Sequence, residues 1–150
     1  INLDNFPVYE TGRGGKYTYH GPGQRVVYLM LDLKKRGQDI KKYVASLENW
    51  IIASLKEIGL ACETKEGKIG IWTKSSNNKD VKIAAIGIRV RKWIAYHGIA
   101  INIHPNLKHY KGIIPCGISE FGVTSLEELG YNLSMQKLDI ILQEKFNDFF

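Results

Sequence analysis

The residue with the clearest capacity for chemistry is Cys116, which lies in the segment IIPCGI between Pro115 and Gly117. The proline fixes φ and removes a backbone donor before the cysteine, and the glycine lets a substrate approach the backbone after it. A thiol presented in this way can act as a nucleophile once it is deprotonated. The alternative is a small buried hydrophobic residue, which is how a free cysteine usually behaves.

Lys82 is the candidate partner of that thiol. In residues 81–90, strand alternation places Lys82 on a face that is otherwise apolar. An ammonium close to sulfur favours the thiolate, and a desolvated lysine can also carry a proton to a leaving group. The alternative is a lysine at a strand end whose side chain reaches solvent.

The segment RGGKYTYHGPGQ, residues 13–24, interleaves glycines with polar and aromatic side chains. This composition is typical of a site loop, with Arg13 and His20 as polar contacts. It does not match a phosphate-binding P-loop, because Lys16 is followed by Tyr17 rather than by Ser or Thr. The alternative is a glycine-rich turn that holds a satisfied histidine.

The remaining candidates carry weaker signals. The spacing of His97, His104 and His109 is irregular and no second cysteine or carboxylate completes a zinc pattern, so we predict no metal site and a structural or cavity-lining His97. Cys62 is interpreted as a packing residue. The basic run RVRK at 89–92 is a solvated strand end, a phosphate contact or a docking patch for an acidic protein.

The pattern of apolar residues predicts the elements that position these side chains. A strand buried on both faces is expected at 25–33, and a helix at about 40–58 that is capped by Asp39 and stopped by Gly59. Further strands are expected at 60–64, 68–73, 81–90 and 93–103, with a hairpin turn at 75–80. A loop-rich stretch is expected at 104–124. Two more helices are expected, a short one from Ser125 to before Gly130 and a final one at about 135–149 that is capped by Ser134. This order predicts an α/β (α+β) fold with a central mixed, largely antiparallel sheet flanked by helices.

Composition restricts the setting. The chain has 150 residues, a formal net charge of +6 and a sequence pI of about 9.3, which favours acidic partners, either nucleic acid or acidic proteins. Two cysteines are too few for a disulfide framework, and neither a secretory signal nor a membrane-spanning run is visible. We therefore expect free thiols in the cytoplasm.

Taken together, RGGKYTYHGPGQ, KIAAIGIRVRKWIAYHGIAINI, IIPCGI and VTSL closely resemble the lipoyl(octanoyl) transferases, from about residue 5 to the C-terminus. The resemblance implies a fold like that of the biotin and lipoate protein ligases. It also implies that Cys116 takes octanoyl from acyl carrier protein as a thioester, that Lys82 lowers the Cys116 pKa and shuttles protons, and that no cofactor is needed. The segments that match the family's substrate-binding residues, with His20 near the reacting sulfur, are Arg13, Gly14, Gly15, Lys16, Tyr17, Thr18, Tyr19, His20, Ala85, Ile86, Gly87, Gly98, Ile99 and Ala100.

The resemblance also implies the partners. Octanoyl-loaded acyl carrier protein is the expected donor, and the lipoyl domains of 2-oxoacid dehydrogenase E2 subunits and the glycine cleavage H protein are the expected acceptors. Apart from the resemblance, we expect a monomer with no nucleic-acid or membrane partner. Members of the family usually carry several tens of residues before the RGG motif, whereas twelve residues precede Arg13 here. We therefore expect residues 1–150 to form one catalytic domain that lacks part of the family's N-terminal segment.

Two other functions fit parts of the sequence. An ATP-dependent lipoate ligase of the same fold would need an adenylate-binding motif and no essential cysteine, and the P-C-G segment argues against it. A non-enzymatic basic module that binds nucleic acid would rest on the net charge and on RVRK alone, and its stacking aromatics would be expected on one exposed sheet face.

Overall fold

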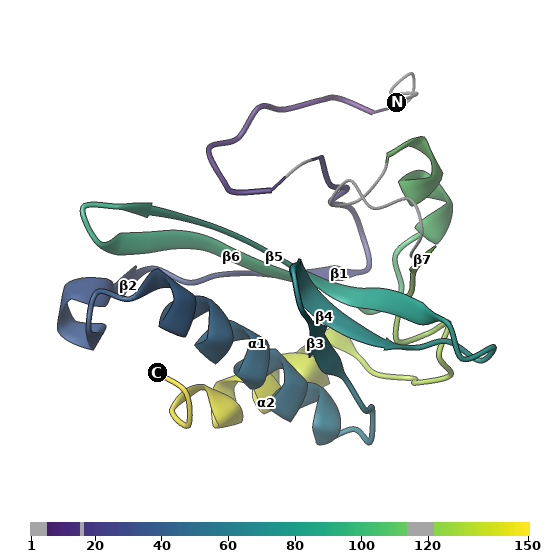
Figure 1. The fold of residues 1–150 in the computed structure, drawn as a ribbon. Helices are drawn as coiled ribbons and strands as arrows, with labels where there is room; N and C mark the ends of the chain where they lie inside the picture. The colour runs from purple at the N-terminus through teal and green to yellow at the C-terminus, as the bar shows by residue number, and fades with distance from the viewer. Residues whose placement is uncertain (1–5, 16, 114–121) are drawn as a thin grey trace.

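A seven-stranded sheet forms the centre of the chain in the computed structural model, which describes residues 6–15, 17–113 and 122–150 (Figure 1). The main path has the order β1-β6-β5-β4-β3, with β2 added beside β6 and β7 beside β5. The strands are β1 (Gln24–Tyr28), β2 (Leu31–Asp32), β3 (Glu63–Lys65), β4 (Lys68–Lys74), β5 (Asp80–Arg91), β6 (Ile94–Asn102) and β7 (Gly122–Val123). All pairs are antiparallel except β5 with β7, so the predicted mixed, largely antiparallel sheet is confirmed.

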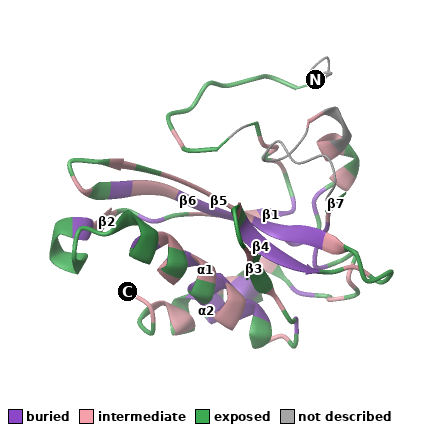
Figure 2. Cartoon of the chain, viewed as in Figure 1, coloured by how far each residue is buried: buried purple, intermediate pink, exposed green. Residues whose placement is uncertain are grey.

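Two α-helices cover one face of this sheet, α1 (Ile40–Lys56) and α2 (Met135–Phe146) (Figure 1). The indole Nε1 of Trp50 donates to the carbonyl of Leu142 at 2.9 Å and joins the two helices. The core between helices and sheet is aliphatic, and its fully buried members include Leu47, Ile51, Leu55, Ile71, Ile83, Ile101, Ile103 and Leu138. Figure 2 shows this buried layer between exposed outer surfaces.

The helix ends follow local capping rules. The Asp39 side chain accepts a hydrogen bond from the backbone N–H of Lys42 at 3.0 Å, and Ser134 does the same for Lys137 at 3.2 Å. Gly59 lies just after α1 and has a left-handed φ of +82°, so the chain leaves the helical path there. The predicted caps at Asp39 and Ser134 and the predicted stop at Gly59 are confirmed.

Three expectations about elements need correction. The strand expected at 25–33 is divided into β1 and β2 and is not buried on both faces, since Tyr28 and Met30 are exposed. The helix expected from Ser125 is a single hydrogen-bonded turn, because Gly130 leaves the helical region at φ +85°. The stretch expected to be loop-rich, 104–124, contains a 3₁₀ helix, η2 (Leu107–Gly112), and the short strand β7. Another 3₁₀ helix, η1 (Leu33–Arg36), follows β2.

Among the described residues, no helix combines the length and the apolar character needed to cross a bilayer.

Candidate active site

A small cavity of about 70 Å³ lies between the N-terminal segment and the strands β1, β5 and β6. The N-terminal segment runs over the sheet on the side opposite the two helices (Figure 1). The cavity is lined by Arg13, Gly14, Gly15, Tyr17, Thr18, His20, Val26, Tyr28, Ala85, Ile86, Gly87, His97, Gly98, Ile99 and Ala100. Three stretches that are far apart in the sequence and were predicted to bind substrate therefore meet at one place: 85–87, 98–100 and six of the residues in 13–20.

Close packing of the N-terminal segment depends on the absence of a side chain at Gly87. A Cβ atom added there would come within 2.9 Å of Arg13 Cδ, so the Arg13 side chain lies directly across this glycine. The backbone N–H of Gly14 donates to the carbonyl of Ile88 at 2.9 Å and ties the segment to β5. The glycine in β5 thus leaves room for the Arg13 side chain to lie across the strand.

His97 gives the cavity a strained wall. Its φ of +66° places a non-glycine residue in the left-handed region within β6, next to Gly98. Such backbone costs on the order of 1–3 kcal/mol and persists where surrounding contacts enforce it, frequently at functional sites. The expected cavity-lining interpretation of His97 agrees with this position.

The imidazole of His20 reaches the cavity from the other side. Desolvation lowers the pKa of His20; a side-chain hydrogen bond with Gln24 raises it, and the Arg13 guanidinium lowers it. The net direction is downward, so the neutral imidazole is favoured near neutral pH. A neutral imidazole can accept or donate a proton, as a general base or a hydrogen-bond donor requires.

A polar network supports the loop that carries His20. Gln24 Nε2 donates to Asn102 Oδ1 at 2.9 Å and to the Tyr110 hydroxyl at 2.7 Å. Asn102 Nδ2 donates to the carbonyl of Thr124 at 2.9 Å. The network therefore links the start of β1, the end of β6, η2 and the chain that follows β7.

Tyr19 does not line the cavity, although it was predicted to bind substrate. Its hydroxyl pairs with Nδ1 of His109 at 2.9 Å, and its ring packs against Phe6, His109 and Tyr110. These contacts attach the loop to η2.

Lys82 also lies outside the cavity lining. Its side chain is buried, its Nζ donates to the carbonyl of Ile69 at 2.9 Å, and the same atom lies 4.7 Å from the centre of the Trp72 ring. The chain that follows the Cys116 segment is attached to the same strand, since Val123 is the register partner of Lys82 and Thr124 N–H donates to the Lys82 carbonyl at 3.0 Å. Cys116 and Lys16 themselves lie outside the described residues.

Sequence reasoning missed two cavity residues, Val26 and Tyr28. They are two apart in β1, so strand alternation places them on one face, and that signal was available in the sequence. In the described part of the chain, no group of three or more His, Cys, Asp or Glu side chains is arranged to hold a metal ion.

Comparison with known proteins identifies the family. The model of the lipoyl protein ligase A/B catalytic domain matches residues 1–147. The chain belongs to this family. The resemblance to lipoyl(octanoyl) transferases predicted from the four motifs is thereby confirmed, and the family is one of enzymes.

The curated relatives are octanoyltransferases. One from Wolbachia pipientis subsp. Culex pipiens (strain wPip) is 60% identical over 148 residues, which cover 97% of this chain and 71% of the relative. Those from Bartonella quintana (strain Toulouse) and Maricaulis maris (strain MCS10) are each 52% identical, with 62% and 67% of their lengths covered. The chain therefore spans about two thirds of the length of these family members.

Solved structures support the fold. The bipartite lipoate protein ligase of Thermoplasma acidophilum superposes with a TM-score of 0.70 at 17% identity, over 91% of this chain and 55% of that one. Biotin protein ligase from Aquifex aeolicus gives 0.63 at 16% identity, over 84% and 52%. The predicted likeness to the biotin and lipoate protein ligase fold is confirmed.

Proposed function

We propose that this chain transfers an octanoyl group from acyl carrier protein to the lysine ε-amine of a lipoyl domain, through a thioester on Cys116. The observation that carries the proposal is the convergence of residues 13–20, 85–87 and 98–100 on one cavity, in a chain 60% identical to an octanoyltransferase. The acceptors are lipoyl domains of 2-oxoacid dehydrogenase E2 subunits and the glycine cleavage H protein, and the setting is the cytoplasm.

The proposed reaction has two steps, acylation of Cys116 and transfer of the acyl group to the acceptor amine. The Cys116 thiolate attacks the carbonyl of the donor thioester, a new carbon–sulfur bond forms, and the carrier's thiolate leaves and takes up a proton. The acceptor amine then attacks the acyl-cysteine, forms an amide, and releases the Cys116 sulfur while the amine loses a proton. Exchange between thioesters is nearly isoenergetic and conversion to an amide is downhill, so no ATP is required.

Lys82 is the proposed proton carrier. The Ile69 carbonyl and the face of Trp72 accommodate its ammonium group although the side chain is 5% exposed. A buried, hydrogen-bonded amine of this kind is held in one place and can serve a neighbouring sulfur. Val123 and Thr124, which follow the Cys116 segment, pair with the Lys82 backbone, which supports proximity of the two side chains.

One lining side chain is suited to change the shape of the cavity. The Arg13 side chain lies over Gly87, where an added Cβ would come within 2.9 Å of its Cδ. Because this long side chain has many rotamers, its movement would uncover the floor formed by Ala85 and Gly87 and give an acyl chain more room.

Intact-mass analysis after mixing the chain with octanoyl-loaded acyl carrier protein tests the proposal. We expect one octanoyl adduct that maps to Cys116 and is absent from Cys116→Ser. Cys62→Ser is the matched control, and it should acylate normally because burial raises the pKa of Cys62 to about 12 and keeps that thiol protonated. A folded wild-type chain without an adduct, or an adduct on Cys62, would contradict the proposal.

A further inference from the structure

Positive charge is concentrated in one part of this molecule. Residues 81–113 contain six of the chain's 21 lysines and arginines and none of its 15 carboxylates, so the other residues hold 15 charges of each sign. Residues 81–113, which comprise β5 after its first residue Asp80, then β6 and η2, therefore carry a net charge equal to that of the whole chain. The same strands form the floor of the cavity.

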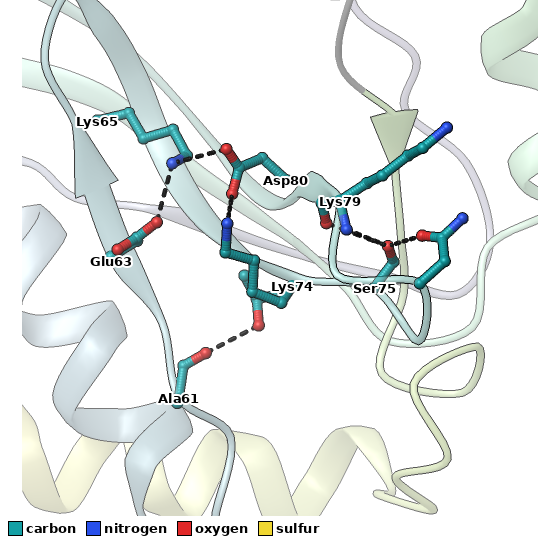
Figure 3. Close-up of polar contacts among 9 residues, drawn as sticks. Ala61, Glu63, Lys65, Lys74, Ser75, Lys79 and Asp80 are labelled. Atoms are coloured by element: carbon teal, nitrogen blue, oxygen red, sulfur yellow. Dashed lines mark hydrogen bonds and ion pairs between the residues drawn. The ribbon is translucent and has the colours of Figure 1, made fainter.

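Cations at the two ends of β5 differ in whether they form ion pairs. At the start of the strand, Asp80 pairs with Lys65 at 2.9 Å and with Lys74 at 2.7 Å (Figure 3). At the other end, Arg89, Arg91 and Lys92 are exposed, and no ion pair to a described carboxylate neutralises them. The cations at the end nearer the cavity are therefore left to solvent or to a partner.

A second group of cations joins this end. The hairpin turn between β5 and β6 is bonded to η1, since Leu33 N–H donates to the carbonyl of Trp93 at 2.8 Å. Lys34 and Lys35 of η1 are exposed, and neither forms an ion pair within the described chain. We call the surface formed by Lys34, Lys35, Arg89, Arg91 and Lys92 the basic hairpin end; its strand and turn lie at the tip of the long β5–β6 hairpin (Figure 1).

The basic hairpin end is continuous with the cavity. Arg89 and Arg91 follow Gly87 at intervals of two, so they continue the face of β5 that bounds the cavity, over roughly 13 Å. The Arg89 guanidinium is oriented by the ring of Tyr96, whose centre is 5.7 Å away, and packs against the backbone at Gly12. A row of cations therefore leads from the tip of the hairpin to the cavity mouth.

We propose that the basic hairpin end is the docking surface for the acyl carrier protein that donates the octanoyl group. This proposal rests on the proposed function. An acidic carrier presents its acyl group on a long phosphodiester-linked arm, so it can dock beside the cavity and still deliver the thioester. The acceptor has to bring its whole domain within one lysine side chain of the acyl group, so it needs the cavity mouth itself.

Charge reversal tests the assignment. Arg91→Glu/Lys92→Glu should raise the Kd for octanoyl-loaded acyl carrier protein about tenfold or more at low ionic strength, with a smaller effect as salt increases. The matched control is Lys79→Glu/Lys137→Glu, which makes the same change in net charge at exposed lysines elsewhere and should bind as the wild type does. Thermal melting verifies that each variant is folded.

The Kd measurement does not require acyl transfer, so it tests the docking proposal, whereas formation of the Cys116 adduct tests the proposed function. If wild type forms the Cys116 adduct but the reversal variant binds the carrier as tightly as wild type does, the docking proposal is wrong. It is also wrong if the control weakens binding equally, if the reversal weakens binding of the lipoyl domain instead, or if short duplex DNA binds at physiological salt more tightly than the carrier. Loss of carrier binding in the reversal variant alone supports the proposal even if no adduct forms.

Discussion

Lys82 shows how a single charged residue can be kept inside this sheet. Its Nζ lies under the Trp72 ring and donates to Ile69, so the ammonium keeps a hydrogen-bond acceptor and an electron-rich face after losing water. Gly70 makes room for it, since an added Cβ would lie 3.1 Å from the lysine Cε. The position of the amine is therefore determined by three neighbouring residues of β4.

Replacing Lys82 separates its chemical role from its packing role. Lys82→Gln retains a donor for the Ile69 carbonyl but removes the charge and the transferable proton, so we expect a folded protein whose Cys116 acylation is about 100-fold slower or more. Single-turnover mass spectrometry across pH measures this rate. Lys79→Gln, in the β4–β5 turn, is the control and should leave the rate unchanged. Acylation of Lys82→Gln at the wild-type rate would remove Lys82 from the mechanism.

Gly98 is required where β1 crosses the cavity wall. A Cβ atom added there would collide with the carbonyl oxygen of Val27, the neighbouring strand's backbone. We therefore expect Gly98→Ala to destabilise the fold by about 1–3 kcal/mol and to lower Tm by several degrees. Gly14→Ala is the comparison, because its added carbon would meet Ile88 O at an ordinary 3.4 Å. Equal melting temperatures for both variants in calorimetry would contradict this expectation, since they would show that β1 shifts to accept the added methyl group without loss of stability.

At the scale of the element, the start of β5 is held by ion pairs (Figure 3). Hydrogen bonds from Lys74 and Lys65 lower the pKa of Asp80 below 3.8, so the unfolded chain binds the proton more tightly. The resulting stabilisation is complete above the unfolded pKa and is lost as pH falls through the folded pKa. The Lys74 side chain is 53% exposed, so solvent screens its pair with Asp80 and the contribution of that pair is small.

Asp80→Asn should therefore melt slightly below wild type at neutral pH, and the difference should shrink below about pH 3.8 or in 1 M salt. Glu66→Gln removes the same charge from an exposed residue in the β3–β4 turn and should have no such pH-dependent effect. Melting curves over this pH range measure both. A deficit in Asp80→Asn that grows in acid would contradict the assigned sign.

The elements that could be predicted are those specified by local sequence. Asp39, Ser134 and Gly59 act on their own helix ends, so the sequence suffices to place them. The break between β1 and β2 depends on a partner, because His97 of β6 adopts a left-handed backbone opposite it and Leu29 N–H turns to its carbonyl. No sequence feature within residues 25–33 predicts that interruption.

At the scale of the whole molecule, the helices occupy one face of the sheet, and the N-terminal segment that lines the cavity runs over the other (Figure 1). Motif resemblance selected twelve of the cavity's lining residues, whereas periodicity alone could not show that residues 13–20 fold over β5 and β6. The +6 charge was visible in composition, but only the fold shows that Lys34 and Lys35 of η1 lie with the cations of the β5–β6 turn at the basic hairpin end. The local sequence pattern does not show which segments far apart in the chain lie together in the fold.

The hydrogen bond from Gly14 to Ile88 also has a protective consequence. β4 pairs with β5 only as far as Ala84, so beyond that residue no strand among the described residues pairs with the side of β5 that faces away from β6. Open edges invite strands of other molecules and lead to aggregation. Because the N-terminal segment that lines the cavity occupies one acceptor on this side of β5, we expect it also to hinder pairing of β5 with a strand of another molecule.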